Sequence, residues 1–293
     1  GGKCGRGVGL RADIDALPMQ EFNTFAHASK HQGKMHACGH DGHTAMLIGA
    51  ARYLAETRQF DGTAVLIFQP GEEGYAGARA MMQDGLFDRF PCEQIYAQHN
   101  SPDIPLGVIG VTPGPMQAAA DTIRIHILGK GGHGARPHQS VDPVLVAAHI
   151  ITAAQSIVAR NIDPQHMAII TVGAFNAGVA NNVIPQTATL RLSVRSLDRE
   201  VRVLLEQRIC ELVHAQAQSY GVKADIDYQR GYPVLVNHMA ETDFARNVAE
   251  ELVGTDKVVR QGRALNGSED FAFMLEEVPG SYLLIGNGDG TGD

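Results

Sequence analysis

Short apolar runs alternate with helical patterns over the first 115 residues. Strands are predicted at residues 8–11, 64–68 and 94–97. Apolar positions recur three and four residues apart over residues 42–57, which predicts an amphipathic helix, and a weaker helical pattern follows at 77–84. This alternation is typical of an α/β fold with a mixed, largely parallel sheet and helices on both faces.

A second pattern begins after the Pro- and Gly-rich residues 111–116. Polar and apolar residues alternate over 121–128, and the complete set of predicted elements has the order β-α-β-β-α-β of a ferredoxin-like domain. Those elements are strands at 121–128, 168–174, 187–194 and 224–228, and helices at 143–158 and 199–219. A helix at 242–253 and a strand at 281–285 resume the first pattern. We therefore predict a discontinuous domain, residues 1–115 and 233–293, with a second domain, residues 116–232, inserted into it.

Composition narrows the range of partners. The chain has 293 residues, of which 24 are Lys or Arg and 32 are Asp or Glu, so its net charge is −8. It contains no run of basic residues. Both observations argue against nucleic-acid and anionic membrane partners and favour a small-molecule partner. No run approaches the roughly 20 apolar residues of a spanning helix, and the first residues have no apolar signal-peptide core. We expect a cytoplasmic protein.

The four cysteines are far apart and form no CxxC pair, so a functional cysteine would act singly.

The densest candidate chemistry lies just before the predicted helix at 42–57, where residues 35–43 read MHACGHDGH. Cys38 and His40, two residues apart in a Gly-containing loop, can turn toward one ion, and sulfur with imidazole favours zinc or cobalt over magnesium or calcium. The alternative is a polar helix start with a buried cysteine. Four potential ligands within nine residues favour the metal.

Two further candidates follow predicted strands. Glu72 and Glu73 come after the strand at 64–68, and His99 comes after the strand at 94–97. Adjacent carboxylates are usually a solvated turn, and a lone histidine is usually structural. In a metallohydrolase, however, one carboxylate binds the ion while its neighbour takes a proton from water. Because the carboxyl ends of parallel strands form one crevice, the shared position of these loops favours a common site.

Six motifs occur in order along nearly the whole chain. They are RADIDALP (11–18), MHACGHDGHTAM (35–46), QPGEEG (69–74), GKGGHGARPH (129–138), NVIP (182–185) and GSEDFA (267–272). With these motifs the sequence resembles the amidohydrolase branch of the M20 metallopeptidases, which includes hippurate hydrolases, indole-acetyl-amino-acid hydrolases and N-acyl-amino-acid deacylases. The resemblance implies a dinuclear catalytic domain that carries an inserted ferredoxin-like lid and dimerisation domain.

The resemblance also implies roles for residues of the first domain. Four residues would be ligands of two divalent ions (zinc, manganese, cobalt or nickel), with Glu72 as general acid and base; these ligands are Cys38, His40, Glu73 and His99. The His-x-Asp motif of other M20 enzymes is Asp13-Ile14-Asp15 here. We therefore assign no direct ligation to Asp13, and expect Asp15 to orient a ligand from behind.

The inserted domain would supply three more residues. The resemblance implies that His133 reaches the active site of a partner subunit in a homodimer and stabilises the oxyanion, and that Asn182 and Arg195 contact substrate. Arg195 suits a bidentate grip on an α-carboxylate. Taken without the resemblance, His133 would be part of a Gly-rich turn and Arg195 a surface cation.

The resemblance leads us to expect a further metal-binding histidine after GSEDFA, but no histidine follows His238. The chain starts with Gly, reaches a strand almost at once, and ends in a loop-like composition. Either the sequence stops short of this histidine or the metal site is defective, and the loop-like end favours the first. We therefore expect about one strand-helix unit to be missing before Gly1 and a metal ligand to be missing after Asp293.

The function implied by the resemblance is metal-dependent hydrolysis of the amide bond in hippurate-like N-acyl-L-amino acids. N-acetyl-diaminopimelate or indole-acetyl-amino-acid hydrolysis are alternatives within the family. A non-catalytic metal- or amino-acid-binding protein is a third, although binding alone has no need of the Glu72-Glu73 pair. A thiol-nucleophile or redox enzyme using Cys38 is a fourth, weakened by the lack of a nearby resolving cysteine. Acyl specificity depends on a pocket volume that the sequence does not reveal.

Overall fold

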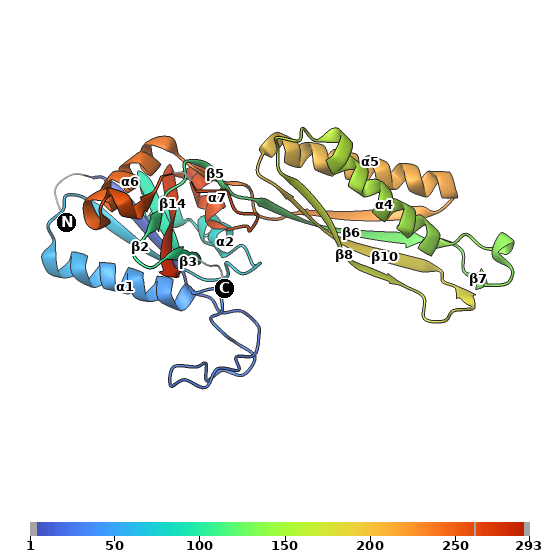
Figure 1. The fold of residues 1–293 in the computed structure, drawn as a ribbon, viewed down its shortest axis with the longest axis horizontal. Helices are drawn as coiled ribbons and strands as arrows, with labels where there is room; N and C mark the ends of the chain where they lie inside the picture. Colours follow the sequence, from blue (N-terminus) through green and yellow to red (C-terminus); the bar gives the residue numbers. More distant parts are fainter. Residues whose placement is uncertain (1–4, 261, 290–293) are drawn as a thin grey trace. The chain divides into compact units, whose positions relative to one another are not determined.

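The computed structural model describes residues 5–260 and 262–289, which form two compact units. Unit 1 comprises Gly1–Met116, Leu235–Ala264 and Glu269–Asp293. Unit 2 comprises Gln117–Val234 together with the short segment Leu265–Ser268. In Figure 1, where the colours follow the sequence, the main segment of unit 2, Gln117–Val234, runs from green to orange.

Unit 1 is built around a six-stranded sheet with the order β13-β4-β14-β3-β1-β2. Its strands are β1 (Gly7–Asp13), β2 (Thr63–Gln69), β3 (Gln94–Pro105), β4 (Ile109–Gly110), β13 (Val258–Val259) and β14 (Gly280–Gly288). Of the sheet's neighbouring pairs, only β14 with β4 is antiparallel. The prediction of a mixed, largely parallel sheet is confirmed.

Smaller elements complete unit 1. A separate two-stranded sheet joins β5 (Gly114–Gln117), whose last residue opens unit 2, to β12 (Leu235–Asn237). The helices are α1 (His40–Thr57), α2 (Gly77–Gln83), α3 (Leu86–Arg89), α6 (Met239–Val253), the 3-10 turn η2 (Thr255–Lys257) and α7 (Phe271–Glu277). The predicted helices at 42–57, 77–84 and 242–253 are therefore present, whereas α7 was not predicted.

Helices cover both faces of the unit 1 sheet because successive residues of a strand point to opposite sides. On β14, Tyr282 belongs to the core cluster that includes Phe271 and Met274 of α7. Its neighbour Leu283 packs with Ala249 of α6 instead. Figure 1 shows α1 lying along the sheet in blue.

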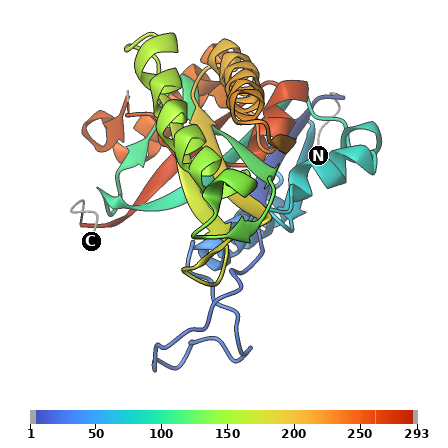
Figure 2. The ribbon, with the colours of Figure 1, turned by 90° about the vertical axis from the view of Figure 1, so that its right-hand side faces the viewer.

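Unit 2 is a four-stranded antiparallel sheet with the order β11-β6-β10-β8. Its elements are β6 (Ala119–Leu128), β7 (Gly132–His133), the 3-10 turn η1 (Pro137–Gln139), α4 (Pro143–Asn161), β8 (Ala168–Ala177), β9 (Val183–Ile184), β10 (Thr187–Ser196), α5 (Arg199–Tyr220) and β11 (Lys223–Arg230). The main elements thus follow one another as β-α-β-β-α-β. Figure 2 shows α4 and α5 side by side over this sheet.

Local sequence explains how the unit 2 helices begin and pack. Asp142 and Asp198 are N-caps whose carboxylates accept backbone N–H groups of the first turns of α4 and α5. Burial alternates along β6, so that Ile123, Ile125 and Ile127 enter the core beneath the two helices. By length and composition α4 is apolar enough to cross a membrane. Its buried face nevertheless packs in this core, as a core helix of a folded domain does.

Candidate metal centre

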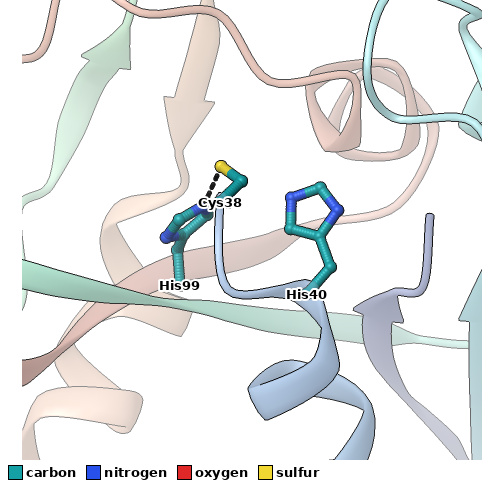
Figure 3. Close-up of side chains that lie close together, drawn as sticks. All are labelled: Cys38, His40 and His99. Carbon is teal, nitrogen blue, oxygen red and sulfur yellow. Dashed lines mark hydrogen bonds between the residues drawn. The ribbon is translucent and has the colours of Figure 1, made fainter. Parts of the chain in front are cut away.

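The candidate ligands of unit 1 come together near the carboxyl ends of β1 and β2. His99 does not follow its strand as predicted, because β3 continues past residue 97 to Pro105 and contains it. Ligand atoms of Cys38, His40 and His99 lie within 4.8 Å of one another, and so do those of His40, Glu72 and Glu73. His40 therefore belongs to both groups. Figure 3 shows Cys38 and His40 projecting from the start of α1, with His99 rising from β3 beside them.

The turn before α1 aims Cys38 and His40 at the same point. Gly39 between them caps the helix with φ 100°, a conformation that L side chains rarely adopt. A Cβ at this position would lie 2.1 Å from Oδ1 of Asn100. Glycine is therefore required here both by the backbone angle and by the close approach of Asn100.

Both candidate imidazole ligands are held in one tautomer. His40 Nδ1 lies 3.0 Å from the carbonyl oxygen of Asp15, and His99 Nδ1 lies 2.6 Å from the carbonyl oxygen of Asn100. A carbonyl can only accept, so each Nδ1 carries the proton and each Nε2 presents a lone pair that can bind a metal ion. Burial lowers the pKa of His99, which also favours its neutral, ligating form.

A cation fits this arrangement. Within the described part of the chain, His40 Nε2, Glu73 Oε1 and Asp15 Oδ1 are buried and have no hydrogen-bond partner. His40 Nε2 and Glu73 Oε1 are 3.9 Å apart. Buried polar atoms without partners are costly, and a metal ion between a carboxylate oxygen and an imidazole lone pair removes that cost.

Cys38 has a buried thiol, not an activated one. Burial, followed by the charges of Glu73 and Glu72, raises the pKa of Cys38 to about 12. Its Sγ lies 3.3 Å from His99 Nε2 and donates to that lone pair. Reactive cysteines have a lowered pKa, so this thiol does not suit a nucleophile, whereas a metal ion would displace its proton.

Asp15 links two ligand-bearing segments. Its Oδ2 accepts the backbone N–H of Glu73 at 3.0 Å, and its Oδ1 lies 3.4 Å from His40 Nδ1. The carboxylate thus orients the turn that carries Glu73 and borders the ring of His40. The role expected for Asp15, orienting a candidate ligand from behind, stays a prediction with which these contacts agree.

Behind the candidate ligands lies a buried ionic network that the motifs alone did not explain. Arg11 Nη1 binds Asp13 Oδ2 at 3.0 Å, while Nη2 binds Glu269 and Asp270 at 2.8 and 3.0 Å. Asp270 in turn donates its backbone N–H to Glu72 Oε1 at 3.4 Å. An arginine inside an otherwise apolar strand, as in β1, is the sequence signal that could have indicated this network.

Burial and neighbouring charges set the protonation of two carboxylates here. Burial, together with the nearby carboxylates of Glu269 and Asp270, raises the pKa of Glu72 to about 10. Burial would also raise the pKa of Asp13, but the His43 hydrogen bond and the Arg11 charge outweigh it and hold that pKa well below its usual range. The surroundings without metal therefore disfavour the charged form of Glu72 and favour that of Asp13.

The remaining candidate residues lie in unit 2. His133, in β7, is exposed and adjoins Asn182, whose carbonyl oxygen accepts the N–H of Gly134 at 2.8 Å. Arg195 is paired with Ala120 on β6, toward the opposite end of the sheet. The structure thus brings His133 and Asn182 together within unit 2, and Arg195 is not with them.

Comparison with known proteins decides the family. A family model described as Peptidase family M20/M25/M40 matches residues 9–293. The chain belongs to this family. The M20 chain is 43% identical to the hippurate hydrolase of Campylobacter jejuni over 286 residues, which are 98% of this chain and 74% of that protein. It is 42% identical to the N-acetyl-L-cysteine deacetylase of Bacillus subtilis, covering 99% of this chain and 68% of that protein.

Solved structures agree with this assignment. A putative aminohydrolase from methicillin-resistant Staphylococcus aureus matches 99% of this chain and 75% of its own with a TM-score of 0.90 at 32% identity. The YXEP protein of Bacillus subtilis, described as a dinuclear metal binding peptidase from the M20 family, matches 96% of this chain and 72% of its own with a TM-score of 0.82 at 34% identity. The M20 chain is therefore an enzyme, an amidohydrolase of this family.

Proposed function

We propose that this M20 enzyme hydrolyses the amide bond of N-acyl-L-amino acids at a dinuclear metal centre in unit 1, releasing a carboxylic acid and an amino acid. The observation that carries the proposal is the pair of ligand groups that share His40, with the adjacent carboxylates of Glu72 and Glu73 at the end of β2. The two groups lie next to each other, which provides donors for two neighbouring cations, and His40 with its one lone pair would bind one of them.

Four side chains would hold the two ions: Cys38, His40, Glu73 and His99. When bound, such ions acidify a water molecule and polarise a carbonyl oxygen. The thiolate and imidazole donors favour zinc, cobalt or nickel, and the carboxylate also suits manganese. The dinuclear description of the YXEP relative supports the number of ions.

Glu72 would move the proton. One of its oxygens receives the N–H of Asp270, which fixes the carboxyl group beside the ligands. Its raised pKa means that it needs positive charge nearby in order to ionise, and the ligands beside it provide a place for that charge. Glu72 would take a proton from water and deliver it to the leaving amine, a contribution of about 10²–10⁴-fold.

Unit 2 would serve as the ferredoxin-like lid and dimerisation domain, residues 116–232, and unit 1 as the catalytic domain, residues 1–115 and 233–293. His133 would stabilise the oxyanion in a partner subunit of a homodimer, with Asn182 in contact with substrate. Nη1 of Arg195 is buried and has no hydrogen-bond partner within the described residues. A substrate α-carboxylate would supply that partner, in the bidentate geometry that guanidinium favours.

The substrate class follows from the relatives. They include hippurate hydrolase, N-acetyl-L-cysteine deacetylase, an indole-acetyl-amino-acid hydrolase of Arabidopsis thaliana and the N-acetyldiaminopimelate deacetylase of Enterococcus faecalis. Each of these names describes an acyl group joined to an amine. We infer a hippurate-like substrate first, because hippurate hydrolase matches at 43% identity over nearly the whole chain. A cytoplasmic location remains a prediction from the sequence.

A substrate panel tests the proposal. Hippurate, N-acetyl, indole-acetyl and longer N-acyl amino acids are incubated with the protein and zinc, manganese, cobalt or nickel, and amine release is followed. Glu72→Gln should keep its metal content and lose at least about 100-fold in kcat. The exposed Glu56→Gln of α1 should keep both. Wild-type turnover in Glu72→Gln would exclude this proton carrier, and metal binding without release of any amine would favour the non-catalytic binding protein.

A further inference from the structure

His43 lies where the unit 1 sheet divides. The parallel pairing of β1 with β3 ends at Arg11 and Ala97, although β1 continues along β2 to Asp13 and β3 continues along β14. Beyond this point no backbone ladder joins β1 and β3 within the described residues. The ring of His43, from the first turn of α1, is the group that bonds to both of them.

Both ring nitrogens of His43 are engaged. Nδ1 lies 2.5 Å from Oδ1 of Asp13, just at the end of β1. Nε2 lies 2.7 Å from Oδ1 of Asn100 on β3 and 3.1 Å from the backbone nitrogen of the same residue. Because an ionised carboxylate oxygen can only accept, Nδ1 carries a proton and donates it to Asp13.

His43 therefore differs from the two neighbouring imidazoles. His40 Nε2 has no hydrogen-bond partner within the described residues, and His99 Nε2 meets the Cys38 thiol. In His43, by contrast, both nitrogens are engaged by Asp13 and Asn100, and the residue is only 1% exposed. Its ring centroid lies 4.4 Å from that of His99 and 5.3 Å from that of His40. The ring thus packs against both candidate ligands, whose own centroids are 5.9 Å apart, although it offers no lone pair to an ion.

The partners of His43 extend its effect to the ligands themselves. Asp13 Oδ2 lies 3.5 Å from His40 Nε2. Asn100 follows His99 directly, holds its Nδ1 through the backbone carbonyl, and lies against Gly39, between Cys38 and His40. Any change in the separation of Asp13 and Asn100 would therefore move ligands on both sides of the division.

We propose that His43 is the positioning residue of the metal centre, a spacer whose two hydrogen bonds fix the distance between the ligands at the start of α1 and the ligand on β3. This inference rests on the proposed metal centre. Residues that orient ligands in this way typically contribute 10–100-fold to metal affinity.

Metal affinity, not turnover, is the test. Metal-free full-length protein is titrated with cobalt and with zinc in competition with a chromophoric chelator, and the cobalt spectrum reports thiolate ligation. His43→Phe keeps the ring volume but neither hydrogen bond, and should bind roughly 10–100-fold more weakly with a changed cobalt spectrum. His43→Asn keeps a donor toward Asp13 and should fall between this variant and the wild type. His31→Asn, an exposed histidine of the preceding loop, is the matched control and should bind as the wild type does.

Far-UV circular dichroism and a urea titration of each metal-free variant separate positioning from folding. If His43→Phe does not fold, the comparison rests on His43→Asn and on Asn100→Ala. A folded variant at position 43 that binds within twofold of the wild type and gives the same cobalt spectrum would overturn the proposal. Wild-type protein that binds no metal would overturn the metal centre itself, and wild-type protein that binds metal but releases no amine would overturn only the proposed hydrolysis.

Discussion

Replacing Arg11 with methionine should be among the most destabilising single changes in unit 1. The guanidinium forms three ion pairs, with Asp13, Glu269 and Asp270, and donates Nε to Gln69 at 2.8 Å. The side chains of all three carboxylates and of Arg11 are at most 3% exposed. Methionine nearly conserves volume, so the variant tests charge rather than packing.

The magnitude follows from the burial of these groups. Removing one partner of a buried ion pair costs about 3–5 kcal/mol, because the other charge stays buried without compensation. Here three carboxylates lose their common cation, so we expect at least this loss at pH 7. Without the guanidinium the carboxylates take up protons more readily, so their repulsion decreases at lower pH. The difference from wild type should accordingly be smaller at pH 5 than at pH 7.

Equilibrium urea unfolding of the metal-free protein, followed by circular dichroism at both pH values, measures this difference. Arg52→Met is the control, since Arg52 pairs with Glu56 at 2.9 Å on the surface with side chains 80% and 65% exposed. Its cost should stay below about 1 kcal/mol. A loss below about 1 kcal/mol in Arg11→Met, or a loss that does not change with pH, would refute the reasoning.

Three other predictions concern the metal centre. Cys38→Ser should lower the number of bound ions measured by elemental analysis, and an unchanged stoichiometry would remove Cys38 as a ligand. Because the pKa of Cys38 is about 12 without metal, metal binding near pH 7 should release a proton from the thiol and become tighter as pH rises. Calorimetry in buffers of different ionisation enthalpy measures the number of protons released. Equal proton release by Cys38→Ser would contradict this prediction. Removing metal with a chelator should lower the Tm, because free metal at 100 times its Kd adds about 2.7 kcal/mol to the free energy of unfolding. An unchanged Tm would contradict binding to the folded state.

Local sequence was sufficient for most of the long elements. The helix expected at 42–57 extends from His40 to Thr57, and the strand expected at 94–97 extends from Gln94 to Pro105. Periodicity reports which side of an element is buried, and burial over a long element needs no knowledge of its partner. The two-residue strands β4 and β13 have too few residues for any period, and they were not predicted.

The positions of the loops relative to the predicted strands also predicted that the candidate ligands lie close together. Cys38, Glu73 and His99 each follow or adjoin a strand of one parallel sheet, and parallel strands place their carboxyl ends at one edge. This inference needs only strand positions and direction. The structure places ligand atoms of all three in groups that include His40.

What each histidine of that loop does was decided only by tertiary structure. His40 and His43 lie three residues apart on one helix, in nearly the same local sequence. In His40 the backbone carbonyl of Asp15 holds the proton on Nδ1, and Nε2 has no hydrogen-bond partner within the described residues. In His43 both nitrogens are engaged, one by Asp13 and the other by Asn100. The same holds for Arg11, whose partner Glu269 is 258 residues away. The sequence by itself therefore determined which chemical groups face the crevice, because local periodicity and strand direction place them there. Their protonation and partners were left to contacts between distant segments, because burial and neighbouring charge depend on the folded chain as a whole.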